Sequence, residues 1–183
     1  MRKVFLFMMT TLDGYFEGQN HDISWHNADS EEFAKFAEDQ LDEADTLVFG
    51  RRTYDLMAGF WPSEEAVKAE PGTATRMNSF KKVVFSRNAL DVEWHNTESS
   101  TNVVEKIHEL KSAPGKDIAV LASSNLCLTL LGKGLLDEIR IMINPLAIGK
   151  GTPLFDGLDK LRQFTLKDSR TFKSGNVLLT YSL

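Results

Sequence analysis

Cysteine is almost absent from this chain: among its 183 residues, Cys127 is the only one that carries a thiol. A single cysteine excludes an internal disulfide, and it excludes a zinc site built on several cysteines. Because leucines flank Cys127, we expect it to be a small buried apolar side chain. The four histidines show no metal-ligand spacing, and His21 and His26 fall in a polar loop where we expect them to be solvated. The sequence therefore predicts no metal site, and a cytoplasmic location fits this composition.

Long apolar runs and an excess of basic residues are also missing. No apolar run is long enough to span a bilayer. The first nine residues have a basic start and an apolar stretch, but Asp13 and Gly14 follow without a small-residue cleavage site. We therefore expect a first core strand there and not a secretory signal. The formal net charge of −5 argues against a broad nucleic-acid surface, although it is compatible with a local basic pocket for a phosphate. We expect neither a membrane nor a nucleic acid as partner.

What is present is an alternation of strand and helix patterns that ends in a hairpin. The expected strands cover residues 4–9, 46–49, 82–86, 118–121, 136–143, 163–172 and 177–181, with a further short one at 92–94. The expected helices cover residues 30–43, 51–57, 101–112 and 124–131. Asp29 and Glu32 resemble a capping box for the first helix, and residues 59–79 should form a loop with short helical turns. The pattern predicts a single α/β domain over residues 1–183, with a mixed sheet that is mostly parallel and antiparallel at its end.

The segment from residue 134 to residue 155 is the most informative pattern in the chain. Residues 136–143 alternate as a strand does, with three isoleucines on one face. Pro145 ends the regular ladder because it has no N–H to donate, and Gly149-Lys150-Gly151 then allows a tight turn beside one lysine. The pattern fits a strand whose end carries a site, and a plain surface loop with turn glycines explains it as well.

Three expected strand-to-helix or strand-to-turn junctions carry residues that suit an anion. In open α/β sheets, ligands bind at the carboxyl ends of the strands, and a helix N-terminus offers free N–H groups to a phosphate. The sequence contains neither a G-x-G-x-x-G nor a Walker motif, so a standard Rossmann or P-loop site is unsupported. Taken alone, a plain turn and a serine-capped helix are the simpler explanations of the second and third junctions, whereas a capped helix with exposed arginines explains the first only as well as a phosphate site does. Together the three junctions favour a bisphosphorylated ligand such as NADPH. The residues are Gly50, Arg51, Arg52 and Thr53, then Ser86 and Arg87, then Ala122, Ser123, Ser124, Asn125 and Leu126.

These segments resemble a known family. Four of them carry the resemblance, which covers nearly the whole chain: Thr11-Leu12-Asp13-Gly14, Gly50-Arg51-Arg52-Thr53-Tyr54, Leu121 to Leu126, and Gly134-Leu135-Leu136-Asp137-Glu138 continuing to Gly149-Lys150-Gly151-Thr152-Pro153-Leu154-Phe155. The chain is similar to the dihydrofolate reductase superfamily, and most closely to the branch related to the C-terminal reductase domain of the bifunctional riboflavin-biosynthesis protein RibD. The resemblance implies a dihydrofolate reductase-like three-layer α/β/α fold, NADPH as hydride donor and a homodimer.

The resemblance also assigns roles to residues. It implies that the first two junctions hold the cofactor phosphates and ribose, and that residues 122–126 approach the pyrophosphate and the nicotinamide side. It places Asp13 and Trp25 on the substrate side. Trp25, Tyr15 and Trp61 could stack on a planar heterocycle, but each could equally be a packing aromatic at the base of a loop, which is the preferred role for Trp61. Asp13 is the candidate acid or substrate hydrogen-bond acceptor, and a turn aspartate before a glycine is the simpler role for it.

The chain departs from the family pattern at two places. The family usually has glycine where this chain has Ala122, and one added methyl group could crowd a close backbone approach. The riboflavin reductases carry paired aspartates and a proline after the first junction, whereas residues 57–62 read Met-Ala-Gly-Phe-Trp-Pro here. The zinc deaminase half of the bifunctional protein is absent from the sequence.

Three functions follow as hypotheses. The first is an NADPH-dependent reductase of a small pterin-like or pyrimidine-like substrate, similar to 5-amino-6-(5-phosphoribosylamino)uracil reductase. The second is a non-catalytic NADP(H)-binding protein on the same fold. The third is a true dihydrofolate reductase, which needs a carboxylate facing the pterin from the first helix. The inward positions expected there are Phe33, Phe36 and Ala37, so only Asp29 or Glu32 could supply that carboxylate from the helix start.

Overall fold

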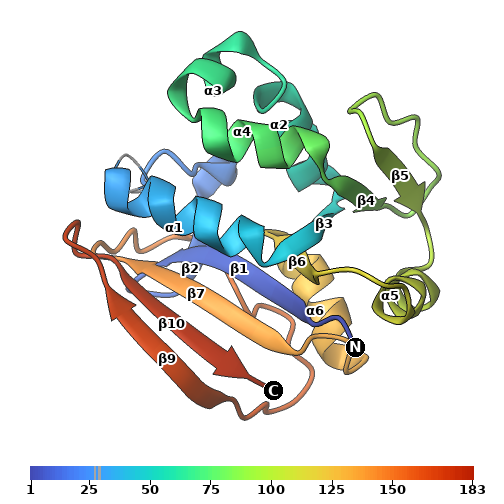
Figure 1. Ribbon diagram of the computed structural model, residues 1–183. Helices are drawn as coiled ribbons and strands as arrows, with labels where there is room; N and C mark the ends of the chain where they lie inside the picture. Colours follow the sequence, from blue (N-terminus) through green and yellow to red (C-terminus); the bar gives the residue numbers. More distant parts are fainter. Residues whose placement is uncertain (27, 29) are drawn as a thin grey trace.

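The computed structural model describes residues 1–26, 28 and 30–183, and its main element is an eight-stranded sheet. The strands of this sheet are β1 (Val4–Thr11), β3 (Ala44–Gly50), β4 (Lys81–Phe85), β5 (Thr97–Ser100), β6 (Asp117–Leu121), β7 (Glu138–Asn144), β9 (Thr165–Thr171) and β10 (Val177–Ser182). Their order is β5-β4-β3-β6-β1-β7-β10-β9 (Figure 1). The strands from β5 to β7 are parallel, and β10 and β9 extend the sheet as an antiparallel hairpin. A separate two-stranded sheet pairs β2 (Tyr15–Gly18) with β8 (Gly151–Pro153).

Helices cover both faces of the main sheet, which makes three layers (Figure 1). One face carries α1 (Glu31–Asp42), α2 (Arg51–Phe60), α3 (Glu64–Ala69) and α4 (Pro71–Ser79), and the other carries α5 (Val103–Ser112) and α6 (Ser124–Gly132). Side chains alternate along β1, so Leu6 packs in the cluster with α5 and α6 while Phe5 packs in the cluster with α2 and α4. No helix in the described part of the chain is both long and apolar enough to cross a membrane.

The predicted fold class is confirmed, and the sequence located most of these elements to within a few residues. Cys127 is buried, as expected. The prediction of a loop at residues 59–79 was wrong, since α3 and α4 are regular helices there. Pro71 does not interrupt α4 because it occupies the first turn, where the backbone N–H has no partner within the helix. It also missed β2, β5 and β8, which are only three or four residues long and gain their pairing from tertiary contacts. Residues 92–94 form no strand.

The start of α1 also differs from the expectation. Asp29 lies outside the described residues, and the N-cap is Ser30, whose hydroxyl accepts the Phe33 N–H at 3.1 Å. Glu32 makes its described contacts with the C-terminal hairpin. It accepts the Lys173 N–H at 2.9 Å and pairs with Arg170 of β9, which ties α1 to the C-terminal hairpin.

The connections between strands reverse direction at the β3–β6 pair. From β3 the chain leaves through α2 on one face and reaches β4, on the far side of β3 from β6. From β6 it leaves through α6 on the opposite face and reaches β7, beyond β1. Such a reversal opens a crevice at the carboxyl ends of the two strands, which is where open α/β sheets bind their ligands.

Candidate functional site

At this crevice, Gly50 and Ser123 touch one another. Gly50 is the N-cap of α2 and Ser123 is the N-cap of α6, and neither helix start has a side-chain cap. A Cβ atom built on Gly50 would overlap Ser123 Oγ and lie 3.2 Å from Ser123 Cβ. Two helix N-termini therefore point their free N–H groups toward one region, which makes that region electropositive and suited to a phosphate.

The backbone before α6 is held in an unusual conformation. Ala122 has φ +54° and Ser123 has φ +79°, a left-handed region that non-glycine residues adopt at a cost of about 1 kcal/mol or more each. The Ala122 side chain packs against the core cluster of β1, β6 and α6. The methyl group of Ala122, which stands where the family usually has glycine, therefore packs against core side chains and does not lie wholly in the crevice.

The third predicted junction lies beside the other two. In the pairing of β3 with β4, Gly50 is opposite Phe85, so Ser86 and Arg87 follow at the same end of the sheet. Ser86 is half-buried and donates its N–H to the Ser100 carbonyl at 3.2 Å, whereas Arg87 is exposed. The three junctions that the sequence singled out are thus consecutive along β4, β3 and β6.

The two arginines of α2 lie differently from one another. The Arg51 Nε donates to both carboxylate oxygens of Asp55, at 2.9 and 2.7 Å, one turn along its own helix. The Arg52 guanidinium extends away from the helix and forms an ion pair with Glu17 of β2. Thr53 is half-buried in the same turn, and Asn125 is exposed and Leu126 buried at the start of α6. Both arginine side chains at the start of α2 are therefore paired with carboxylates of the same chain in this structure.

Glu17 is the charged residue that the sequence reading missed. Its side chain is 5% exposed. One carboxylate oxygen accepts from the Thr152 hydroxyl at 2.8 Å and is 3.0 Å from His21 Nδ1, and the other pairs with Arg52. These partners hold the pKa of Glu17 below its ordinary value although burial opposes this. Only the -Tyr-Phe-Glu-Gly- alternation after Asp13-Gly14 could have marked it as an inward-facing strand residue.

Asp13 is engaged as a hydrogen-bond acceptor. Its carboxylate accepts the Thr11 hydroxyl at 2.6 Å and the backbone N–H groups of Ile148 and Gly149 at 3.2 and 2.8 Å. The Thr11 bond, with these backbone bonds, lowers the pKa of Asp13. An ionised carboxylate that joins two loops is better suited to positioning them than to donating a proton.

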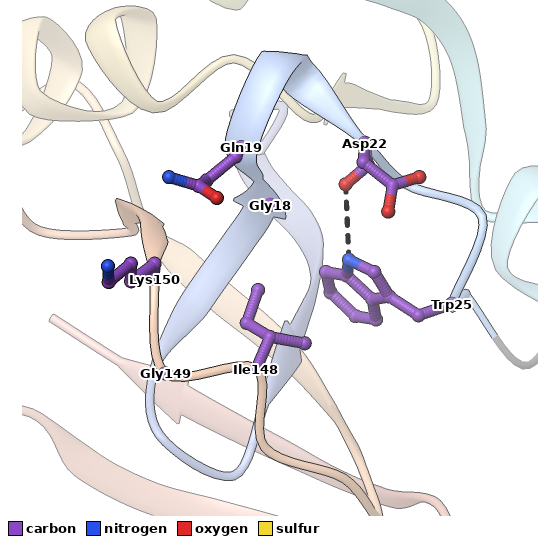
Figure 2. A pocket seen from close by; sticks show the side chains of 7 residues that line it. All are labelled: Gly18, Gln19, Asp22, Trp25, Ile148, Gly149 and Lys150. Atoms are coloured by element: carbon purple, nitrogen blue, oxygen red, sulfur yellow. Dashed lines mark hydrogen bonds between the residues drawn. The ribbon is translucent and has the colours of Figure 1, made fainter.

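The other two residues predicted for the substrate side line one open groove. Trp25 lies against a pocket of about 420 Å³ with Gln19, Ile148 and Lys150, and its indole N–H donates to the Asp22 carbonyl at 3.1 Å (Figure 2). Tyr15 lines an adjoining pocket of about 420 Å³. Both pockets share residues 18–19 and 149–150, so they form one groove between β2 with the short 3₁₀ helix η1 (Gln19–His21) and the Gly-Lys-Gly loop.

His26 is not solvated, which corrects the expectation from sequence. Its ring hydrogen-bonds to the backbone of Phe16, and its buried Nε2 has no hydrogen-bond partner among the described residues. Burial lowers the pKa of His26, so the ring is neutral near pH 7. Trp25 packs against it edge-on, with ring centroids 4.5 Å apart. Within residues 1–26, 28 and 30–183, no group of three His, Cys, Asp or Glu side chains could hold a metal ion.

Solved structures share this fold. They include a Shewanella sp. PV-4 protein assigned to riboflavin biosynthesis (TM-score 0.74, 21% identity, 98% of each chain covered). They also include a Thermotoga maritima diaminohydroxyphosphoribosylaminopyrimidine deaminase/5-amino-6-(5-phosphoribosylamino)uracil reductase (TM-score 0.70, 16% identity), which aligns with 99% of this chain and over 56% of its own length. These structural similarities confirm the expected dihydrofolate reductase-like three-layer fold.

Sequence comparison identifies the family. A Bacillus subtilis (strain 168) protein, YyaP, itself uncharacterized, is 33% identical over 181 residues, which are 98% of this chain and 94% of YyaP. A model of the RibD C-terminal domain matches residues 2–178. The chain therefore belongs to the RibD C-terminal domain family.

Proposed function

We propose that this protein is an NADPH-dependent reductase that acts on a pterin-like or pyrimidine-like heterocycle. The observation that carries the proposal is the contact between Gly50 and Ser123, which brings two uncapped helix N-termini together where the sheet connections reverse. Membership of a family related to riboflavin-biosynthesis reductases supports the same conclusion. NADPH, when bound, would supply a hydride to an electrophilic carbon of the substrate.

The residues at the crevice fit a dinucleotide phosphate. The free N–H groups of residues 124–126 and of the first turn of α2 would bind the pyrophosphate, with the hydroxyls of Thr53 and Ser123 beside them. Arg87, on the neighbouring junction, would bind the second phosphate group together with Ser86. A side chain at position 50 would intrude between the two helix starts, which explains why glycine suits that position.

The groove beside the crevice would hold the substrate. Trp25 offers an aromatic face, and Tyr15 closes the other end of the groove near the Gly149 carbonyl, 3.4 Å from its hydroxyl. Asp13 fixes the loop that forms one wall, so we assign it a positioning role. We further propose that the chain acts as one domain and in the cytoplasm, as its pattern and composition led us to expect, and as a homodimer, as the family resemblance implies.

A non-catalytic NADP(H)-binding protein is the second candidate. It is favoured by Ala122, which stands where the family usually has glycine, and by residues 57–62, which lie in α2 and after it without the paired aspartates of the riboflavin reductases. A true dihydrofolate reductase is less well supported. Glu32, the described carboxylate at the start of α1, is paired with Arg170 and Lys173 of the C-terminal hairpin.

Two measurements test the proposal. Isothermal titration with NADPH and with NADH should show binding that prefers NADPH, and variants Arg87→Gln and Ser124→Pro should weaken it. NADPH oxidation, followed by absorbance against a panel of oxidised pterins and pyrimidine ribosides, should then identify a substrate. Binding without turnover on any of these compounds would favour the non-catalytic candidate, and no binding of either nucleotide would exclude both.

A further inference from the structure

Glu17 is a buried charge to which the proposed reaction gives no role. It lies on β2 among residues that line the groove, and only 5% of its side chain is exposed. In the pairing of β2 with β8, Glu17 is opposite Thr152, whose hydroxyl donates to the carboxylate at 2.8 Å. A carboxylate enclosed to this degree is costly unless polar or charged partners surround it. Its partners come from η1, β8 and α2, so its position fixes these three segments relative to one another.

The first wall of the groove depends on Glu17 through the tight turn that follows it. His21 has a φ of +63°, a left-handed conformation that a non-glycine residue keeps only where surrounding contacts impose it. The His21 Nδ1 lies 3.0 Å from a carboxylate oxygen of Glu17. At the end of the turn, the Asp22 carbonyl accepts the Gly18 N–H at 2.8 Å and the Trp25 indole N–H at 3.1 Å (Figure 2). The turn that Glu17 holds therefore also orients Trp25.

The second wall of the groove is held by the same residue. The bond from Thr152 joins the Glu17 carboxylate to β8, at the end of the loop formed by residues 149–151. The two backbones are in close contact as well, since a Cβ atom built on Gly151 would lie 2.2 Å from the Glu17 carbonyl oxygen. Glu17 therefore contacts both walls, one through the bond near His21 and the other through its carboxylate and its backbone.

Arg52 connects this carboxylate to the cofactor crevice. It lies in the first turn of α2, two residues after the N-cap Gly50. Its guanidinium pairs with the Glu17 oxygen that Thr152 and His21 do not contact. Its Nη1 also lies 3.4 Å from His21 Nε2 and can only donate to it, which closes a ring of three side chains. The start of α2 and the groove are thus joined by direct contacts.

We propose that Glu17, together with Arg52, is a positioning pair that holds both walls of the substrate groove and ties them to the start of α2. Both residues act through the segments that they hold. The groove loosens when the pair is broken, and it becomes more rigid when a bound dinucleotide fixes the start of α2. This inference rests on the proposed function for the identity of the cofactor and for the use of the groove by a substrate.

Hydrogen exchange of the ¹⁵N-labelled protein, followed by NMR, tests the positioning role without any ligand. The readouts are the Gly18 amide and the Trp25 indole N–H, which both donate to the Asp22 carbonyl. Arg52→Gln should speed exchange at both groups about fivefold, because it removes a charged partner from a buried carboxylate, and the effect is reduced by the partial exposure of Arg52. It should also shift the indole resonance of Trp25.

Matched variants separate positioning from a general loss of stability. Arg51→Gln removes the same charge from the same turn, but Arg51 pairs with Asp55 along its own helix, so exchange at the groove should change less than about twofold. Lys111→Gln breaks a pair with Asp137 at the opposite end of the sheet, where β7 begins, and should lower overall stability without speeding this local exchange. Arg52→Lys keeps the positive charge and should restore most of the protection.

Glu17→Gln tests the other member of the pair with a side chain of the same shape. It should speed exchange at the Gly18 amide and the Trp25 indole at least as much as Arg52→Gln does. Because the two residues act as one unit, adding Arg52→Gln to Glu17→Gln should speed exchange by less than a further twofold or so.

NADPH extends the test to the cofactor crevice. Saturating NADPH should slow exchange at Gly18 and Trp25 in the wild-type protein, and Arg52→Gln should lose most of this slowing. The proposal is overturned if Arg51→Gln and Arg52→Gln speed exchange alike, if the effects at positions 17 and 52 are additive, or if bound NADPH changes exchange equally with and without Arg52. A protein that does not bind NADPH would refute the reductase proposal instead, and the variants of the free protein would still decide whether Glu17 and Arg52 hold the groove.

Discussion

The substitution Gly50→Ala tests whether the two helix starts act as one site. Gly50 has φ −75° and ψ 159°, which alanine adopts without strain, so the effect of the change lies in the contact with Ser123 alone. The new methyl group would overlap Ser123 Oγ and approach Ser123 Cβ to 3.2 Å. The hydroxyl can rotate away, but the backbones of α2 and α6 must still separate by a few tenths of an ångström.

The expected magnitude follows from two opposing terms. Overpacking of this kind costs about 1–3 kcal/mol, and we take about 2 kcal/mol because the hydroxyl rotates easily but the two backbones must still separate. Replacing glycine by alanine in an allowed conformation stabilises by about 0.4–1 kcal/mol through the unfolded chain. The net loss in the free energy of unfolding should be about 1 kcal/mol, equivalent to roughly 2–4 °C in Tm. The affinity for NADPH should fall about tenfold, because the backbone N–H groups at the starts of α2 and α6 would no longer be close enough together to bind the same phosphate.

A double-mutant cycle with Ser123→Ala provides the measurement. Urea denaturation and NADPH titration of the four proteins should show that Gly50→Ala is harmful when Ser123 is present and nearly neutral when it is combined with Ser123→Ala. The coupling free energy should be about 1 kcal/mol in stability. Additive effects on stability would refute the contact, and a Gly50→Ala variant that destabilises the protein but binds NADPH normally would refute the shared phosphate site.

Two further predictions concern buried groups outside the crevice. Lys82 is fully buried and its ammonium group donates to the carbonyls of Met77, Asn78 and Phe80 at 3.0, 3.1 and 2.7 Å. Lys82→Met should therefore destabilise the protein by about 1–3 kcal/mol in urea denaturation, because the C-terminal carbonyls of α4 lose their partner. The same change at its more exposed neighbour Lys81 should cost under about 1 kcal/mol, and equal losses at both positions would contradict the capping role. For His26, burial lowers the folded-state pKa below the ordinary 6.5. The unfolded chain therefore binds more protons in the interval between the two pKa values, and the free energy of unfolding should fall as the pH is lowered below about 6.5. His26→Phe should flatten this slope in pH-dependent thermal melts, and an unchanged slope would assign it to other groups.

The sequence predicted the parts of the fold that depend on local pattern. Apolar alternation and helical spacing located the central strands and the long helices, and the hairpin turn at residues 174–176 was also found. Short elements were missed because their stability is not local. The strand β2 exists because β8, more than 130 residues away, pairs with it. Residue Glu17 on β2 was missed for the same reason.

For the candidate site, the sequence predicted the three junctions but not the contacts that their side chains make. It treated Arg51 and Arg52 alike, because adjacent arginines look equivalent in a sequence. In the structure one is paired along its own helix with Asp55 and the other crosses to Glu17. Likewise, His21 and His26 looked like two solvated histidines, and burial separates them into a groove residue and a neutral, enclosed one.

The sequence by itself determined the alternation of strands and helices, the anion-friendly residues at the strand ends, and the family resemblance, because these depend on neighbours within a few positions along the chain. Only the tertiary structure decided that Gly50 meets Ser123 and that Glu17 holds His21 and Arg52 at the Lys150 loop. These contacts join residues 73, 4 and 35 positions apart, and two of the three separations are far beyond the range of any local pattern. They form because the reversal of connections at β3 and β6 and the pairing of β2 with β8 bring distant segments to one end of the sheet.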